Sequence, residues 1–216
     1  MAEARIATIL PNAGGSPVLA ALLLVAGAYL IGSVSFAVVV SRAFGLPDPH
    51  DYGSKNPGAT NVLRTGNRLA ALLTLLGDGL KGFVAVFAVR ELAPLVGAPQ
   101  WLVPVAALAV FVGHLYPLFH RFRGGKGVAT AAGIVLAIHW PLGIVLIAVW
   151  LTMAFGFKIS SLAALTTAVL LPLGLLYAKG PGLDFVAGVA IAALLFWRHR
   201  TNIRSLLSGR ERTIGQ

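Results

Sequence analysis

The sequence predicts an all-α integral membrane protein with seven transmembrane helices, an outer N-terminus and a cytoplasmic C-terminus. Three observations carry this prediction: the composition, the length of the charge-free stretches, and the placement of Lys and Arg. Hydrophobic residues make up 57% of the 216 residues and charged residues 11%, whereas soluble domains average roughly 45–50% and about 25%. A soluble fold this poor in charge would leave its surface apolar, and a disordered chain would hold far less apolar sequence.

The expected spans follow from the charge-free stretches, since about 20 apolar residues cross a bilayer as a helix. Residues 17–41 are expected to form one tilted helix. The charge-free stretch 127–157 exceeds one crossing at roughly 1.5 Å per residue, and His139-Trp140-Pro141 should divide it into two helices. The complete set of expected spans is 17–41, 69–88, 101–119, 127–138, 141–157, 159–178 and 185–197.

The basic residues favour seven spans over six, because cytoplasmic loops of membrane proteins are rich in Lys and Arg. With seven spans, the basic loops share the cytoplasmic side with the Arg-rich tail, and the other side keeps only Arg5, Arg90 and Lys179. With six spans, the Arg-rich tail would lie on the other side of the membrane from Lys126. This placement explains the net charge of +10, so no nucleic-acid partner is expected.

Polar residues gather in three segments on the predicted cytoplasmic side. The first segment, 53–64, contains Ser54, Asn56, Thr60 and Arg64. Its Gly and Asn residues permit positive φ, so backbone N–H groups can converge on an anion. We interpret this segment as an anion-binding loop, with an ordinary cytoplasmic turn as the alternative.

The second segment combines His114 with the run Gly124-Gly125-Lys126-Gly127, which opens an expected helix. Free N–H groups, the positive end of the helix dipole and a lysine together suit a phosphate. The run is not a P-loop, because His120 stands at the first Gly of that pattern and Gly127 replaces the Ser or Thr that holds magnesium. The alternatives are a loop that only follows the positive-inside rule, and a His114 ring buried against a carbonyl.

Two further sets of polar residues have plainer alternatives. Ser161 is grouped with His199 and Asn202 of the basic tail, although the tail alone is typical of an anchor to lipid headgroups. Asp78 and Lys81 lie three residues apart on one face of an expected span, where each charge is costly. We expect these two to form a structural ion pair; the alternative is that they steady the first polar loop.

Other kinds of chemistry are not indicated. The chain has no cysteine, which excludes disulfides, thiolate catalysis and Cys-ligated metals. None of the five histidines begins a His-x-x-x-x-Asp acyltransferase motif, and no Gly-x-Ser-x-Gly elbow occurs. No carboxylates have metal-binding spacing with His. The sequence therefore predicts phosphate-binding groups without a nucleophile, a metal or a cofactor.

Six blocks of sequence carry a family resemblance, in order and with fitting spacing from about residue 28 to the C-terminus. They are GSKNPGATNVLR (53–64), GDGLKGF (77–83), GHLYPLF (113–119), FRGGKGVAT (122–130), SSLAAL (160–165) and RHRTNIRSLLSGRE (198–211). Together they resemble the bacterial membrane acyl-phosphate:glycerol-3-phosphate acyltransferases. The resemblance implies seven transmembrane helices with a cytoplasmic active site, in a multi-pass protein of the bacterial inner membrane. The placement of Lys and Arg predicts a periplasmic N-terminus. The resemblance also implies acyl transfer from acyl phosphate to the 1-position hydroxyl of glycerol 3-phosphate, giving lysophosphatidate and phosphate.

The resemblance implies site residues only where positions match the family. Expected catalytic residues are His114, Lys126 and Arg64, and expected substrate- and phosphate-binding residues are Ser54, Asn56, Thr60, Gly125, Ser161, His199 and Asn202. Lys158 is an additional candidate with an open role, because the family has Arg-Tyr where this chain has Lys158-Ile159. We expect an N-terminal extension at 1–16, one transmembrane catalytic domain at 17–204 and a short cytoplasmic tail at 205–216.

The chemistry of the residues agrees with this activity. An acyl phosphate is already activated, so the protein must hold two anions, align the hydroxyl and stabilise the departing phosphate. The hydroxyl proton passes either to His114 or to a substrate phosphate oxygen, and the sequence does not choose. Acyl phosphate, glycerol 3-phosphate and the lipid bilayer are the expected partners, while the oligomeric state stays open, a monomer included.

Two other functions remain as alternatives. A transporter of an anionic or phosphorylated solute would normally show internal repeats and broken helices at the membrane midplane, whereas the polar segments here gather on one face. A structural or assembly protein would not need so many anion-binding groups. Synthesis of lysophosphatidate by the purified protein separates the enzyme from both.

Overall fold

The computed structural model describes residues 16–214, and within them every regular element is a helix. The expected all-α architecture is therefore confirmed for this part of the chain. In chain order the elements are α2 (Pro17–Gly32), α3 (Phe36–Ala43), α4 (Ala59–Leu63), α5 (Arg68–Leu95), α6 (Leu102–Leu115), η1 (Leu118–His120), α7 (Val128–Ile138), α8 (Trp140–Phe157), α9 (Ser160–Lys179), α10 (Leu183–Arg198) and α11 (Arg200–Leu207).

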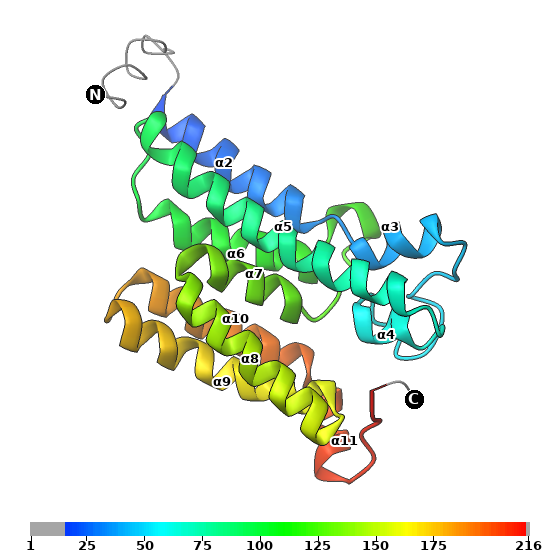
Figure 1. Ribbon diagram of the computed structural model, residues 1–216. Helices are drawn as coiled ribbons and strands as arrows, with labels where there is room; N and C mark the ends of the chain where they lie inside the picture. The colour runs from blue at the N-terminus through cyan, green and yellow to red at the C-terminus, as the bar shows by residue number, and fades with distance from the viewer. Residues whose placement is uncertain (1–15, 215–216) are drawn as a thin grey trace.

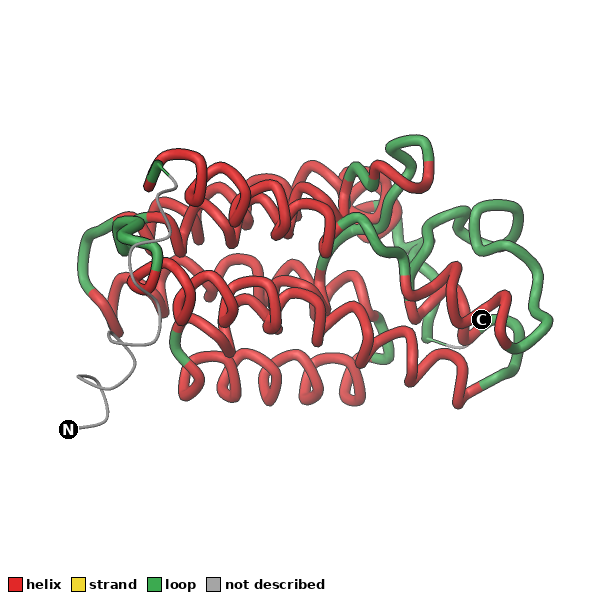
Figure 2. The backbone as a smooth tube through the Cα atoms, turned by 90° about the horizontal axis from the view of Figure 1, so that it is seen from above, coloured by secondary structure: helices red, strands yellow, loops and turns green. Residues whose placement is uncertain are grey.

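The long helices form two groups that meet along one seam (Figure 1). One group contains α2, α5, α6 and α7, the other contains α8, α9 and α10, and contacts of α7 with α8 and of α6 with α10 join them. Figure 2 shows the long helices running side by side, with many of the loops gathered at one end. The short helices α3, α4 and α11 lie at that end (Figure 1), far from the start of α2.

The helices are apolar enough for a membrane. Among residues 16–214, four helical stretches have the length and composition of a span: α5, α6 extended through η1, α8 and α9. The bent pair α2 and α3 counts as a fifth if it forms one span. Helices α7 and α10 are shorter, at 11 and 16 residues.

The first expected span is broken, which corrects the prediction of one helix over 17–41. Helix α2 ends at Gly32, α3 begins at Phe36, and their axes differ by 45°. The break leaves the Val34 carbonyl outside the helical ladder, where it accepts a hydrogen bond from Lys81 Nζ at 2.6 Å. Hydropathy along 17–41 does not reveal this break, because its polar partner lies on another helix.

The predicted division at His139 is confirmed. Helix α7 ends at Ile138 and α8 starts at Trp140, with His139 between them. The His139 ring caps α8 by accepting from the Leu142 backbone N–H at 3.2 Å. Arg90 of α5 donates to the Ala137 carbonyl at 2.8 Å and so binds one of the last carbonyls of α7.

The expected ion pair between Asp78 and Lys81 is also confirmed. Lys81 Nζ lies 2.8 Å from Asp78 Oδ1, and both side chains are less than 5% exposed. Thr130 of α7 donates to the Asp78 carbonyl at 2.9 Å. The Lys81 side chain therefore connects α5 to the break before α3, and the Asp78 backbone connects α5 to α7.

Glycines allow the helices around this pair to approach closely. A Cβ on Gly32 of α2 would overlap the Val110 carbonyl of α6, and a Cβ on Gly133 of α7 would overlap the Gly79 carbonyl of α5. Such contacts are typical of membrane proteins, where small residues let helix backbones pack against each other. The expected extension 1–16 lies outside the described residues, except for Ser16.

Candidate active site

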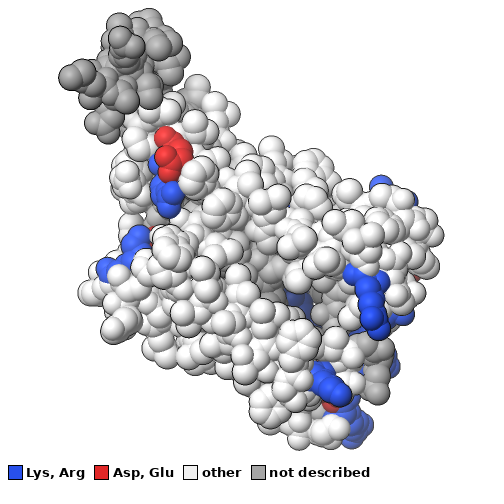
Figure 3. Space-filling view, viewed as in Figure 1, with Lys and Arg blue, Asp and Glu red and all other residues white. Residues whose placement is uncertain are grey.

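A cavity of about 770 Å³ lies between the two helix groups. Its walls come mainly from α5, α7, α8 and α9, and much of its lining is apolar, including Leu76, Phe83, Leu136 and Trp150. Figure 3 shows a hollow on this face of the molecule, with Lys and Arg side chains toward one end. At its polar end the cavity is lined by nine of the predicted site residues: Ser54, Asn56, Thr60, Arg64, His114, Lys126, Ser161, His199 and Asn202.

The first polar loop folds around Asn61, which is 2% exposed. Its Nδ2 donates to the carbonyls of Pro49 at 2.9 Å and Tyr52 at 3.2 Å, and its Oδ1 accepts from the Ser54 N–H at 2.9 Å. Gly53 has φ +57°, and a Cβ there would overlap Asn61 Oδ1. The glycine and the buried amide together place Ser54 at the cavity.

Arg64 follows the short helix α4 and lies beside the same amide, donating to Asn61 Oδ1 at 3.2 Å. The pKa of Arg64 is lowered by burial and by the neighbouring charge of Arg212, while Glu211 opposes the shift. Sequence analysis did not single out Asn61, because an Asn in a Gly-rich loop gives no local sign that four bonds will converge on it.

The Gly-Gly-Lys-Gly loop is held from outside by a guanidinium. Arg198, at the end of α10, donates through Nε to the Gly125 carbonyl at 3.1 Å and through Nη2 to the Gly124 carbonyl at 2.6 Å. Gly125 does not line the cavity; a Cβ there would overlap His114 Nε2, so this glycine permits close packing. The loop opens α7 at Gly127, whose φ is +86°.

Lys126 belongs to a chain of polar contacts that crosses the cavity wall. Lys126 Nζ donates to Asn202 Oδ1, and Asn202 Nδ2 donates to Glu211 Oε1 at 2.6 Å. Ser161 Oγ donates to the same Glu211 oxygen at 2.7 Å. Glu211 thus joins two predicted site residues; the only signal for it in the sequence was a lone carboxylate within a basic block.

Burial lowers the pKa of two residues near this cavity, Lys126 and His199. It lowers the pKa of Lys126 to about 8; the carboxylate of Glu211 opposes this shift, and Arg198 and Arg64 add to it. Burial and the charge of Lys126 lower the pKa of His199 to about 4. His199 is therefore neutral near neutral pH, its Nδ1–H donates to the Leu195 carbonyl at 2.8 Å, and Nε2 is the acceptor nitrogen.

His114 is enclosed by protein atoms. Its side chain is 7% exposed, and its Nδ1 lies 3.2 Å from Thr130 Oγ1 and 3.7 Å from Asp78 Oδ1. Its backbone carbonyl accepts from the Gly125 N–H at 3.3 Å. His114 is thus placed to fix the position of the Gly-Gly-Lys-Gly loop as well as to line the cavity.

Lys158 lies apart from the other candidates. It ends α8 with a φ of +56°, and its carbonyl accepts from the Ile214 N–H at 2.7 Å. It is not part of the cavity lining. Over residues 16–214, the structure brings no three His, Asp or Glu side chains into an arrangement that could hold a metal ion.

Comparison with known proteins decides the family. The model of the glycerol-3-phosphate acyltransferase family matches residues 22–209. The chain belongs to this family. A glycerol-3-phosphate acyltransferase of Cupriavidus pinatubonensis is 56% identical over 200 residues, which cover 92% of this chain and 98% of that protein. One from Burkholderia lata is 58% identical over 190 residues, covering 87% of this chain and 88% of that protein.

Two solved structures of a family member have the same fold. Both are crystal structures of PlsY (YgiH), described as an integral membrane glycerol 3-phosphate acyltransferase. The glycerol 3-phosphate form gives a TM-score of 0.83 at 37% identity and covers 91% of this chain and 96% of that one. The lysophosphatidic acid form gives a TM-score of 0.81 at 36% identity, with coverages of 90% and 95%. The resemblance of the six sequence blocks to this family is thus confirmed.

Proposed function

We infer that this protein transfers an acyl chain from acyl phosphate to the 1-position hydroxyl of glycerol 3-phosphate, forming lysophosphatidate and phosphate. Family membership supports glycerol 3-phosphate as the acceptor. One observation carries the proposal: a single cavity has a cationic, hydroxyl-rich end and a long apolar wall. Such a cavity suits a molecule with a phosphate at one end and a hydrocarbon chain at the other.

Different polar groups of the cavity bind the phosphates of the two substrates. Arg64 offers a planar fork, suited to two phosphate oxygens, while Lys126 supplies a compact charge beside Asn202. Ser54, Asn56, Thr60 and Ser161 fill the remaining acceptors of the two substrates. Held in this way, the glycerol hydroxyl and the acyl carbon react as a preorganised pair, and the charge on Lys126 stabilises the departing phosphate.

The reaction needs no covalent intermediate. The glycerol oxygen bonds to the acyl carbon, the bond from that carbon to the phosphate oxygen breaks, and the departing phosphate takes up the hydroxyl proton. His114, enclosed as described, positions the phosphate-binding loop in this scheme. His199 Nε2 accepts a hydrogen bond from the hydroxyl and orients it, because a histidine with a pKa of about 4 is a weak base.

We also propose the membrane arrangement. The bent pair α2–α3 and the helices α5, α6, α7, α8, α9 and α10 form seven spans in the bacterial inner membrane. The N-terminus is periplasmic, and the polar end of the cavity faces the cytoplasm, where the basic loops gather. Residues 17–204 form the catalytic domain.

The donor test uses the purified protein with one acyl group presented as acyl phosphate, as acyl-CoA or on acyl-carrier protein. We expect lysophosphatidate from acyl phosphate alone, and the same rate after treatment with EDTA. Efficient synthesis from acyl-CoA would refute the donor assignment. Movement of glycerol 3-phosphate into vesicles without product formation would favour a transporter.

A further inference from the structure

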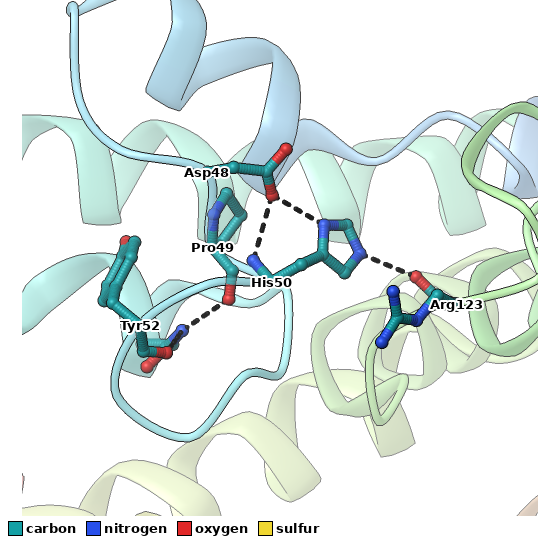
Figure 4. A network of polar contacts seen from close by, with 6 residues as sticks. Asp48, Pro49, His50, Tyr52 and Arg123 are labelled. Carbon is teal, nitrogen blue, oxygen red and sulfur yellow. Dashed lines mark hydrogen bonds and ion pairs between the residues drawn. The ribbon is translucent and has the colours of Figure 1, made fainter.

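His50 connects the two substrate-binding loops without lining the cavity (Figure 4). It lies in the loop between α3 and α4, three residues before the first polar segment 53–64. Its side chain is 16% exposed, and the cavity walls do not include it. The His50 ring reaches Asp48 through Nδ1 at 2.6 Å and the backbone carbonyl of Arg123 through Nε2 at 2.8 Å. Arg123 directly precedes Gly124, so the second contact ends at the first residue before the phosphate-binding loop.

Both neighbours of the ring are hydrogen-bond acceptors. A carbonyl oxygen accepts only, and so does an ionised carboxylate. Burial disfavours the ionised form of Asp48, but hydrogen bonds from the backbone N–H of His50, at 2.9 Å, and from its ring outweigh that effect and lower the pKa of Asp48. A neutral imidazole has one N–H and can satisfy one of the two acceptors, whereas an imidazolium satisfies both.

The Arg123 carbonyl is the first of three consecutive carbonyls bound by side chains from other parts of the chain. His50 binds the carbonyl of residue 123, and Arg198 binds those of Gly124 and Gly125. The two donors come from opposite ends of the chain. Between them they fix the backbone on the N-terminal side of Lys126, whose ammonium must meet the substrate.

We propose that His50 is a positioning residue whose two ring contacts, with Asp48 and with the Arg123 carbonyl, hold the phosphate-binding loop against the loop between α3 and α4. This inference rests on the proposed acyl transfer. Besides Asp48, the His50 ring lies near the ring of His120 in η1, with the two ring centroids 6.3 Å apart.

The first test compares His50→Arg with His50→Ala, because a guanidinium can also donate on two sides. Lysophosphatidate synthesis is measured at low glycerol 3-phosphate and at one fixed pH. We expect His50→Arg to recover much of the activity that His50→Ala loses. Arg121→Asn, at an exposed position near the same loop, is the control and should stay close to wild type.

Removal of the ring should cost activity at every pH. His50→Ala is expected to lose roughly 10-fold to 10²-fold, the scale that a small misplacement of reacting groups costs. Equal activities of His50→Arg and His50→Ala would overturn the proposal, and so would wild-type activity in His50→Ala. No product from any of these proteins, wild type included, would instead count against the proposed reaction.

The second test does not depend on activity. Because the chain has no cysteine, Arg123→Cys introduces a single thiol and keeps the backbone carbonyl that His50 binds. At one fixed pH, a maleimide should label this cysteine faster when His50→Ala is added than when His50→Arg is added. Equal labelling rates in the two backgrounds would mean that the ring does not hold the loop.

Discussion

Lys126 is the residue on which the cationic end of the cavity depends most directly. Its Nζ is held by Asn202, and through that amide it is linked to Glu211 and Ser161. We expect Lys126→Ala to lose roughly 10²–10³ in rate, the scale of removing one preorganised donor to a transition state. Arg121→Asn, which removes an exposed cation near the start of the same loop, should stay close to wild type. Near-normal kinetics for Lys126→Ala would mean that this lysine serves only as a positive charge that fixes the membrane topology.

The pH profile provides an independent check on Lys126. Its pKa of about 8 means that the ammonium loses its proton as pH rises through that value. The rate at low glycerol 3-phosphate, which reports the free enzyme, should therefore fall above about pH 8. Lys126→Arg stays charged throughout, so any activity that it retains should lack this alkaline fall. An alkaline fall that is identical in the two proteins would have another origin.

Lys158 either binds substrate or only ends helix α8, and substitutions at this position distinguish the two roles. Its left-handed backbone and its bond to Ile214 explain its position without a substrate. Lys158→Ala should then leave KM for glycerol 3-phosphate unchanged, and Lys158→Gly should fold at least as well, since glycine adopts positive φ without strain. A rise in KM for Lys158→Ala that Lys158→Arg reverses would return this residue to the site.

At the residue scale, most of the candidate residues line one cavity, and each could be found in the sequence because it lies within a short motif. Nine candidates meet at one polar end. Arg198 and Glu211 were inside a recognised block but without a role, because their contacts with Gly124 and with Ser161 span 74 and 50 positions of sequence. Local patterns indicate which groups are present; they do not indicate which of them support the others.

At the scale of elements, the break between α2 and α3 depends on a buried ion pair. Lys81 satisfies the Val34 carbonyl and Asp78 together. Lys81→Met should cost about 3–5 kcal/mol, because it leaves the Asp78 carboxylate buried without its partner. Adding Asp78→Asn should recover part of this loss. The measurement is a double-mutant cycle of thermal unfolding in detergent; additive effects of the two substitutions would show that the pair is not coupled.

The helices were predictable to different degrees. The division at His139 follows from a proline and a capping side chain within four residues, so it can be recognised locally. The break at Ser33-Val34-Ser35 contains neither proline nor charge, and its position depends on Lys81 and on the close approach of Gly32 to α6. Elements that end for local reasons are visible in a sequence; those that end because of a neighbour are not.

For the whole molecule, the proposed topology makes opposite predictions for two exposed positions. Single cysteines are introduced as Gly182→Cys, between α9 and α10, and Ser208→Cys, after α11. In cells with a permeabilised outer membrane, an impermeant maleimide should label Gly182→Cys and spare Ser208→Cys until the cells are lysed. The reverse pattern would contradict the proposed orientation, and labelling of both positions before lysis would contradict α10 as a membrane span.

Helices α5 and α8 give the cavity a side entrance as well as a polar end. Leu72, Leu76 and Leu80 of α5, together with Leu151 of α8, line the cavity and are between 41% and 59% exposed. A substrate with a hydrocarbon tail can therefore arrive by diffusion within the plane of the lipid, while glycerol 3-phosphate arrives from the water. The relevant concentration of the acyl donor is then its mole fraction in the bilayer. Dilution of a fixed amount of donor and protein with inert phospholipid should slow turnover, whereas dilution with buffer should not.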